Sequence, residues 1–207
     1  MNKGMTRTAL RRWGLYCWTL LKWTVDAAAI GVVCGVIGTL FHFGVHEVTA
    51  FRGAHPWVLY CLPAVGLVIV GFYKLTKTDG LGTDDIIDAV HQGKRLPFFL
   101  LPAIFLGTIL THLCGGSAGR EGAALQMGGT VRQCMGRVFH LDDKDLRVAT
   151  LAGMAAFFSA LFGTPLAATV FAIMVISIGV IYHVALYPSL LAALVAYGVS
   201  LHLGVEP

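Results

Sequence analysis

Charged residues are distributed unevenly along the chain and leave four long apolar gaps. Residues 27–51 contain a single charge, Glu47, while residues 53–73, 96–119 and 149–205 contain none. About 20 mainly apolar residues are enough for a helix to cross the hydrocarbon core of a bilayer. Each of the first three gaps therefore predicts one membrane-spanning helix.

The last gap is too long for one helix; Pro165 and Pro188 interrupt it, and Tyr182-His183 offers a polar break. Proline inside a helix removes a backbone donor and breaks or kinks the helix. We therefore expect one helix ending near Leu161, a second across about 165–180 and a third across 184–203.

Composition agrees with a membrane protein. The 207 residues are 57% hydrophobic and 13% charged, with a mean hydropathy of +0.75, whereas about a quarter of the residues of a soluble domain are charged. The five cysteines form no Cys-x-x-Cys pair. His42 and His46 are four residues apart, and we expect them to hydrogen-bond near the interface rather than bind a metal. No metal and no cofactor are expected.

The N-terminus is basic and aromatic. Five cations precede the first acidic residue, Asp26, and three tryptophans lie among them: Lys3, Arg7, Arg11, Arg12 and Lys22, with Trp13, Trp18 and Trp23. The positive-inside rule places this end in the cytoplasm. Residues 1–23 are expected to form a cytoplasmic or interfacial segment, with an amphipathic helix over 5–23 on the membrane, and residues 24–207 a transmembrane half-domain. A solvated basic tail is the alternative. The predicted location is the inner (plasma) membrane, crossed several times.

A polar segment, 78–95, separates the second and third gaps. Thr83 can cap a short helix there, with Asp84 and Asp85 in its acidic first turn. Pro97 is expected to open the next span, because proline is allowed at the first helical positions.

Arg120 and Glu121 are the only charges between Arg95 and Arg132. An ionisable residue at membrane depth is expensive and is read as functional by default. Glycine-rich residues 115–119 are expected to form a turn before a helix that begins at about Arg120. The N–H groups and positive dipole end of such a helix form a ready anion site, and broken helices of this kind build the sites of secondary transporters.

Glu121, in the first turn, would compete with a transported anion for this potential. Protonation would free the site and couple anion movement to protons. Alternatively, Arg120 and Glu121 only pair with each other or with lipid headgroups.

These residues carry a family resemblance. Gly119-Arg120-Glu121-Gly122, preceded by Gly-Gly-Ser and followed by Leu125–Gly129, resembles the gating-glutamate motif of the CLC family of chloride channels and proton-coupled anion antiporters. Phe162–Ala167 resembles the later family element in which Pro-Leu-Ala follows a helix break. The resemblance runs from about residue 24 to 205. It implies an all-α integral membrane protein with the CLC-type inverted-repeat fold, of which this chain is the first half, and broken helices meeting near the bilayer midplane.

The resemblance also implies roles for individual residues. Glu121 corresponds to the gating and proton-accepting glutamate. The backbone around it, and the stretch that replaces the family's Gly-Ser-Gly-Ile-Pro element, would bind the anion: Gly119, Arg120 and Gly122, with Leu81, Gly82 and Thr83. Residues beside the two helix breaks would support them: Gly115, Gly116, Ser117, Gly163 and Pro165. Leu81 stands where chloride-selective members have serine, which resembles the fluoride-exporting branch.

Two departures from the family pattern matter. The stretch Phe171–Val175, with Met174, has no glutamate where many chloride/proton exchangers have a relay, so proton coupling needs another route. The chain also stops at Pro207, before the second inverted half. We expect a fragment or truncated product of a protein that is a homodimer in its full-length form; a self-assembling half-transporter is the alternative.

Three functions are considered. Proton-coupled fluoride export leads, with a small inorganic anion, protons and the lipid bilayer as partners and no nucleic acid. A chloride channel or chloride/proton antiporter is the second. A membrane hydrolase using Ser117 and His112 is the third, but it needs a nucleophile and a base that meet within hydrogen-bond reach only by chance. We therefore expect no enzyme activity.

Overall fold

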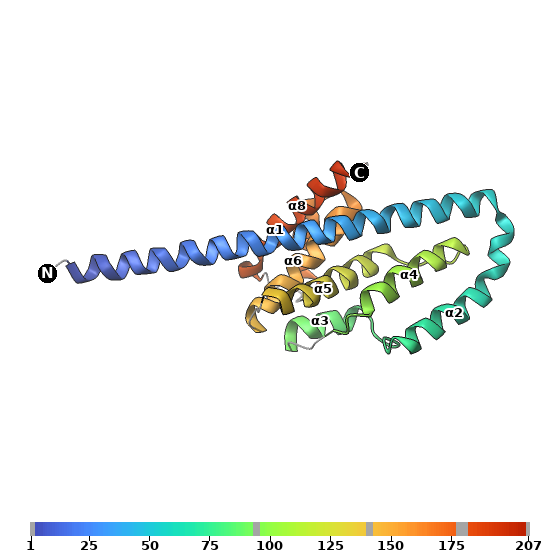
Figure 1. The fold of residues 1–207 in the computed structure, drawn as a ribbon, viewed down its shortest axis with the longest axis horizontal. Helices are drawn as coiled ribbons and strands as arrows, with labels where there is room; N and C mark the ends of the chain where they lie inside the picture. The colour runs from blue at the N-terminus through green and yellow to red at the C-terminus, as the bar shows by residue number, and fades with distance from the viewer. Residues whose placement is uncertain (1–2, 93–95, 140–142, 177–181, 206–207) are drawn as a thin grey trace.

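The computed structural model describes residues 3–92, 96–139, 143–176 and 182–205, and the regular elements within these ranges are all helices (Figure 1). In chain order they are α1 (Lys3–Ala54), the 3₁₀ helix η1 (Pro56–Cys61), α2 (Leu62–Leu75), α3 (Thr83–Gln92), α4 (Leu100–Leu113), α5 (Arg120–Phe139), α6 (Asp143–Phe162), α7 (Pro165–Met174), the 3₁₀ helix η2 (His183–Ala185) and α8 (Leu186–His202).

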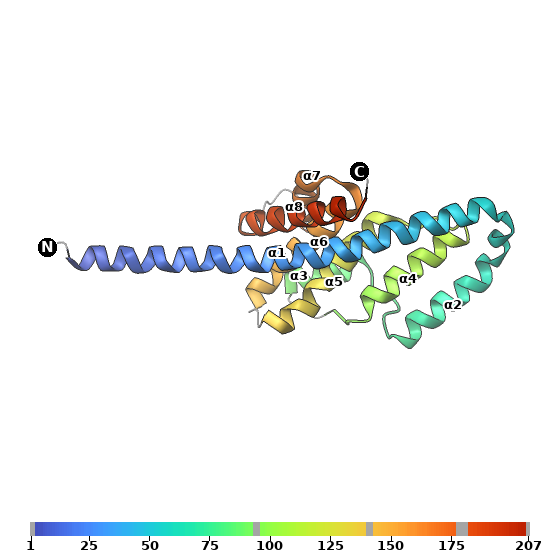
Figure 2. The same cartoon turned by 45° about the horizontal axis from the view of Figure 1, so that its top comes forward.

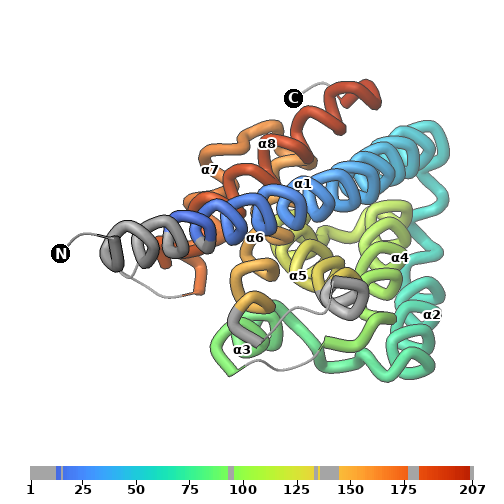
Figure 3. Tube along the Cα trace, turned by 60° about the vertical axis from the view of Figure 1, so that its left-hand side comes forward, coloured from blue at the N-terminus to red at the C-terminus, as the bar shows by residue number. Residues whose placement is uncertain are grey.

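Helix α6 lies at the centre and packs against α1, α5, α7 and α8. Helices α7 and α8 lie on one side of α1, and α2 to α5 lie on the other (Figures 2 and 3). Many of the buried residues of α6 are small, and several of these have no exposed surface: Ala149, Ala152, Ala155, Ala156 and Ala160. Lys22 and Asp145 form an ion pair that ties α1 to the start of α6.

Glycines let the central helices touch backbone to backbone. A β-carbon on Gly128 of α5 would lie 2.3 Å from the carbonyl oxygen of Gly153 on α6, and the reverse distance is also 2.3 Å. Gly31 and Gly35 of α1 approach the backbone of α8 in the same manner, at 2.7 and 3.1 Å. Such small-residue contacts are the usual way for helices to associate in a membrane, where lipid tails remove the hydrophobic drive.

Four helical segments of the described residues are long and apolar enough to cross a membrane: Tyr16–Ala54, Pro56–Leu75, Asp145–Phe162 and His183–His202. The prediction of membrane-spanning helices is thus confirmed for the first, second and last apolar gaps. Within the last gap, α6 ends at Phe162, α7 begins at Pro165 and α8 ends at His202, close to the predicted limits. Residues 177–180 of the predicted second helix lie outside the described residues.

The prediction that gap 96–119 holds one spanning helix is wrong. Helix α4 begins at Leu100 and has 14 residues, which gives a length of about 21 Å against a hydrocarbon core of about 30 Å. Pro97 does not open the helix; its carbonyl accepts a hydrogen bond from the Leu100 N–H in a turn that precedes α4. The length of an apolar gap overestimates the length of its helix when residues at both ends of the gap form turns, as they do here.

The helix predicted over 5–23 is not a separate element. Helix α1 is continuous for 52 residues, about 78 Å at the normal rise, and its N-terminal part projects beyond the other helices (Figure 1). Trp13 and Trp18 are exposed there.

The α5–α6 crossing yields a stability prediction. Gly128→Ala should destabilise the protein by about 1–3 kcal/mol, because the new methyl group meets rigid backbone rather than a flexible side chain. The measurement is unfolding in detergent, followed by tryptophan fluorescence. Gly198→Ala in α8 is the matched control, since open space surrounds that position; it should be neutral or stabilising by up to about 1 kcal/mol. Equal stability of the two variants would contradict the proposed backbone contact.

Candidate functional site

The turn between α4 and α5 is built by two glycines. Gly115 has φ +79°, a conformation that glycine adopts without steric cost. The Gly115 N–H donates to the His112 carbonyl at 3.1 Å, and the Gly116 N–H donates to the Thr111 carbonyl at 2.9 Å. This is the Schellman pattern of helix termination. Gly115 and Gly116 therefore close the C-terminal end of α4.

Arg52, at the end of α1, adds to this closure. Its Nη1 donates to the His112 carbonyl at 3.1 Å, and its side chain packs against Gly115. No local pattern predicts the hydrogen bond, because Arg52 and His112 are 60 positions apart and belong to different predicted spans. Ser117, further along the turn, is exposed.

Helix α5 begins at Arg120, as predicted, with Glu121 in its first turn. The first N–H groups of a helix have no partner within it and carry the positive end of the dipole. The Glu121 carboxylate turns back over them, since its Oε2 lies 3.6 Å from the position of a β-carbon on Gly119. The negative group and the electropositive helix start thus lie together.

Gly119, Arg120 and Glu121 are exposed, although the sequence predicted an ionisable group buried at membrane depth. The buried face of α5 begins just beyond, at Ala123 and Ala124. The first turn of α5 extends past that face, and none of the described helices covers the side to which Glu121 points.

A second helix start is formed by residues 80–85. Gly80 has φ +77°, and the Gly82 N–H donates to Oδ2 of Asp85 at 3.0 Å. The predicted cap, Thr83, is instead the first residue of α3, and Asp85 reaches back in its place, as in one half of a capping box. Leu81 is half-buried and packs against the apolar core.

The two helix starts meet. The Gln126 side-chain amide of α5 donates to the Thr83 hydroxyl at 3.1 Å, and a β-carbon on Gly122 would lie 3.6 Å from the same oxygen. The N-terminal ends of α3 and α5 therefore converge beside Gly122. Two positive dipole ends with backbone N–H groups at one place favour a small anion.

Gly163 and Pro165 form a helix break of their own. Gly163 has φ +66° and its N–H donates to the Ser159 carbonyl at 2.9 Å, after which α7 begins at Pro165. Helix α7 packs on α6 and α8. None of the described contacts brings this break to the convergence of α3 and α5.

His42 of α1 is a residue that the sequence did not assign to the site. It is half-buried and lies close enough to Arg120 and His46 to interact with both electrostatically. Its place beside the start of α5 depends on the packing of α1, which the periodicity of α1 alone does not fix.

Comparison with known proteins identifies the class. The sequence model of the voltage gated chloride channel family matches residues 65–207. The chain is 37% identical over 188 residues to the chloride/fluoride channel protein of Pseudomonas syringae pv. tomato, covering 90% of this chain and 42% of that protein. It is 30% identical over 163 residues to the H(+)/Cl(-) exchange transporter ClcA of Vibrio campbellii, covering 71% of this chain and 35% of that protein.

Solved structures agree. A crystal structure of a CLC-type fluoride/proton antiporter superposes with a TM-score of 0.87 at 36% identity, covering 91% of this chain and 48% of that one. A slow cyanobacterial Cl⁻/H⁺ antiporter superposes with a TM-score of 0.74 at 22% identity, covering 89% of this chain and 47% of that one, which supports the fold alone.

These matches define an all-helical membrane protein with the CLC fold. The chain belongs to the voltage gated chloride channel family, as its motifs predicted. It spans less than half the length of the curated relatives that it matches.

The contact between Thr83 and Gln126 can be tested by a double-mutant cycle. Thr83→Val and Gln126→Met should each lower the free energy of unfolding by about 0.5–1.5 kcal/mol, and the double variant should lose less than the sum. Unfolding in detergent, followed by tryptophan fluorescence, measures this. Thr164→Val is the control, since Thr164 is exposed and makes no side-chain capping bond. Strict additivity of the two changes would mean that the residues do not interact.

Proposed function

We propose that this chain forms half of a proton-coupled anion transporter that exports fluoride. The observation that supports it best is the convergence of the α3 and α5 starts at Gly122 beside the Glu121 carboxylate. Backbone N–H groups aimed at one place bind an anion, and a carboxylate at the same place competes with it. Relatives named as fluoride/proton and chloride/proton antiporters favour this reading.

Glu121 acts as the gate in this proposal. When ionised, it occupies the positive potential of the α5 start itself. Protonation removes its charge, so that an anion can take its place. One proton is then taken up for each opening of the path, which couples the two movements.

The anion path is completed by further polypeptide that covers the exposed side of Glu121. A second inverted half of the same fold, or a second copy of this chain, would supply it. The complete transporter is proposed to be a homodimer in the inner membrane, with residues 1–23 on the cytoplasmic side at the interface and residues 24–207 as the transmembrane half-domain.

Fluoride is favoured over chloride by the α3 start. Fluoride is small and strongly hydrated, so it needs close N–H donors in place of its water. Gly119 and Gly122 have no side chain that limits approach to their N–H groups. Leu81 places an apolar side chain next to Gly82, at the position where the family resemblance implies a serine hydroxyl in chloride-selective members. Chloride transport remains the second candidate, since relatives of both kinds match this chain.

The gate is tested with Glu121→Gln, which keeps the size of the side chain but cannot ionise. In liposomes containing the complete transporter, this change should abolish proton movement driven by a fluoride gradient, read with a pH-sensitive dye. Glu47→Gln, on the exposed face of α1, should leave the coupled fluxes unchanged. Normal coupling in Glu121→Gln would reject the assigned role.

Selectivity is tested with Leu81→Ser, measured by ion-selective electrodes during efflux of each halide from liposomes. The added hydroxyl can donate to a larger, less strongly hydrated anion, so the ratio of chloride to fluoride efflux should rise by about tenfold, equivalent to roughly 1.4 kcal/mol. Leu81→Met is the matched control and should keep the ratio. A chloride preference in the unchanged protein would instead select the second candidate function.

A further inference from the structure

A groove of about 560 Å³ lies between the end of α2 and the start of α4. These two helices lie side by side at one edge of the molecule (Figures 1 and 3). The lining comes from the last part of α2, the residues that follow it and the start of α4: Phe72, Leu75, Thr76, Lys77, Phe99 and Pro102. Tyr73 of α2 and Gly107 of α4 hold the helices together beyond the groove, since a β-carbon on Gly107 would lie 3.1 Å from the Tyr73 ring.

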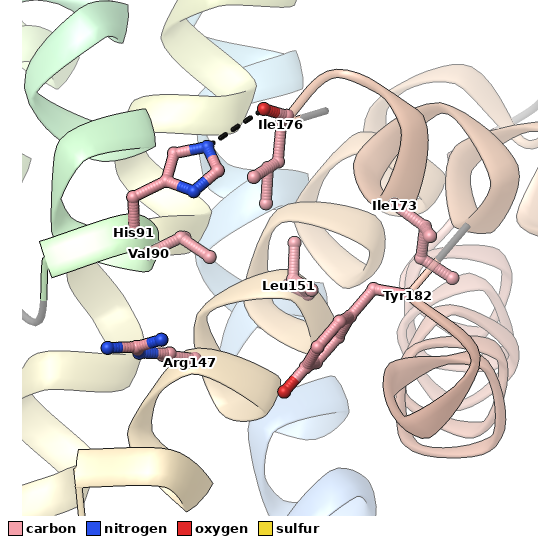
Figure 4. Close-up of a pocket in the computed structure, with 7 residues that line it drawn as sticks. All are labelled: Val90, His91, Arg147, Leu151, Ile173, Ile176 and Tyr182. Carbon is pink, nitrogen blue, oxygen red and sulfur yellow. Dashed lines mark hydrogen bonds between the residues drawn. The ribbon is translucent and has the colours of Figure 1, made fainter. Parts of the chain in front are cut away.

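A smaller cavity, of about 110 Å³, lies between α3, α6 and α7 (Figure 4). Its wall includes the hydrogen bond between Nε2 of His91 and the Ile176 carbonyl, at 2.9 Å. Arg147 and Tyr182 add further polar groups to that wall. The groove between α2 and α4 is larger and almost wholly apolar. The groove is therefore the one of the two that suits a hydrocarbon chain.

The groove faces the membrane. Helix α2 belongs to the segment Pro56–Leu75, which is long and apolar enough to cross a bilayer, and none of the residues of α2 is buried. On the groove wall, Leu75 is 82% exposed and Phe99 is 56% exposed. Apolar surface of this extent is stable when hydrocarbon rather than water covers it. Lipid is therefore the natural neighbour of this surface.

Lys77 lies at the end of the groove where a lipid headgroup would be. The 6 residues of η1 and the 14 residues of α2 together span about 33 Å, which matches a hydrocarbon core of about 30 Å. Lys77, two residues beyond α2, is exposed and is thus at headgroup level. Asp79, the next acidic residue along the chain, does not line the groove. The groove therefore combines an apolar wall with one positive charge at its end, and basic pockets between spanning helices bind anionic headgroups.

The backbone of Lys77 independently indicates that its side chain has a use. Its φ is +55°, and it is the one residue other than glycine with a positive φ in the described part of the chain. The Lys77 N–H donates to the Lys74 carbonyl at 3.1 Å, and the Thr78 N–H donates to the Tyr73 carbonyl at 3.0 Å. This is the Schellman pattern, in which glycine is usual, and Gly115 fills the same place after α4. A side chain here strains the backbone, so the lysine charge is the feature that needs a function.

We propose that this groove binds an anionic phospholipid. One acyl chain lies against Phe72, Leu75 and Pro102, and the Lys77 ammonium group donates to the headgroup phosphate. No covalent bond forms or breaks. A phospholipid with no net charge fits the same groove, but the cation of its own headgroup offsets the phosphate and weakens the attraction to Lys77. The lipid site is independent of the proposed anion transport.

The headgroup contact is tested by native mass spectrometry of the complete transporter, in detergent with equimolar phosphatidylglycerol and phosphatidylcholine. The unchanged protein should retain phosphatidylglycerol in preference. Lys77→Gln should lower the ratio of the two bound lipids by about fivefold, the scale of one lysine at an anionic surface. Lys74→Gln is the matched control, because it removes the same charge from the end of α2 but Lys74 does not line the groove. Equal loss in both variants, or no preference in the unchanged protein, would overturn the proposal.

Two further changes at the same position separate lipid binding from folding. Lys77→Gly removes the charge and relieves the backbone strain, so it should lose the preference for phosphatidylglycerol while unfolding in detergent no more easily than the unchanged protein. Lys77→Arg keeps the charge and should keep the preference. A preference that survives in Lys77→Gly, or is lost in Lys77→Arg, would show that the lysine charge does not hold the lipid.

The acyl chain is tested by filling the groove. Phe72→Trp adds volume to the groove wall and should reduce the number of retained lipids of both kinds. Leu67→Trp is the control, since Leu67 is exposed on α2 and does not line the groove; its lipid retention should equal that of the unchanged protein. Unchanged retention in Phe72→Trp would mean that no chain occupies the groove. Displacement of phosphatidylglycerol by soluble glycerol phosphate would likewise reduce the site to a simple anion contact and reject the lipid.

Discussion

The structure depends on one constraint: a break in a helix at membrane depth must leave each backbone polar group with a partner. The C-terminal end of α4 and the N-terminal ends of α3 and α5 meet this constraint in different ways. The C-terminal end of α4 is closed by Gly115, Gly116 and Arg52, which engage its carbonyls. At the starts of α3 and α5, the contacts of the described residues include the Gly82 N–H on the Asp85 carboxylate. The first N–H groups of a helix have no acceptor within the helix, so these two starts supply donors that suit an anion.

Close backbone packing holds this site in place. The contact of Gly128 with Gly153 fixes α5 against the central helix α6, and the bond of Gln126 to Thr83 fixes α3 against α5. The glycine contact allows little sliding, because a backbone that touches another backbone cannot adapt as a long side chain does. The two electropositive ends are thus placed by the helix crossings rather than by the residues that would meet the anion.

The sequence predicted those parts of the fold that depend on local chemistry. The charge gaps and Pro165 located the α6–α7 break to within a residue or two, because proline and charged residues affect the backbone at their own positions. Prediction from the sequence failed where contacts between distant residues determine the structure. The sequence predicted Thr83 as the cap of α3, but Thr83 is the first helical residue and bonds to Gln126, while Asp85 accepts from the Gly82 N–H. The links of Arg52 to the α4 end and of His42 to Arg120 join separate helices, so no local pattern reveals them.

Helix α3 presents its electropositive start to the candidate site. Its first residue, Thr83, accepts a hydrogen bond from the Gln126 side chain of α5, so the first N–H groups of the two helices lie near one another. Neither helix start alone combines donors from two directions, which is why the packing of α3 on α5 matters more to the site than the residue types at either start. The apolar face of α3, buried through Ile86 and Val90, fixes both ends against α5 and α6, so neither end can move without the other.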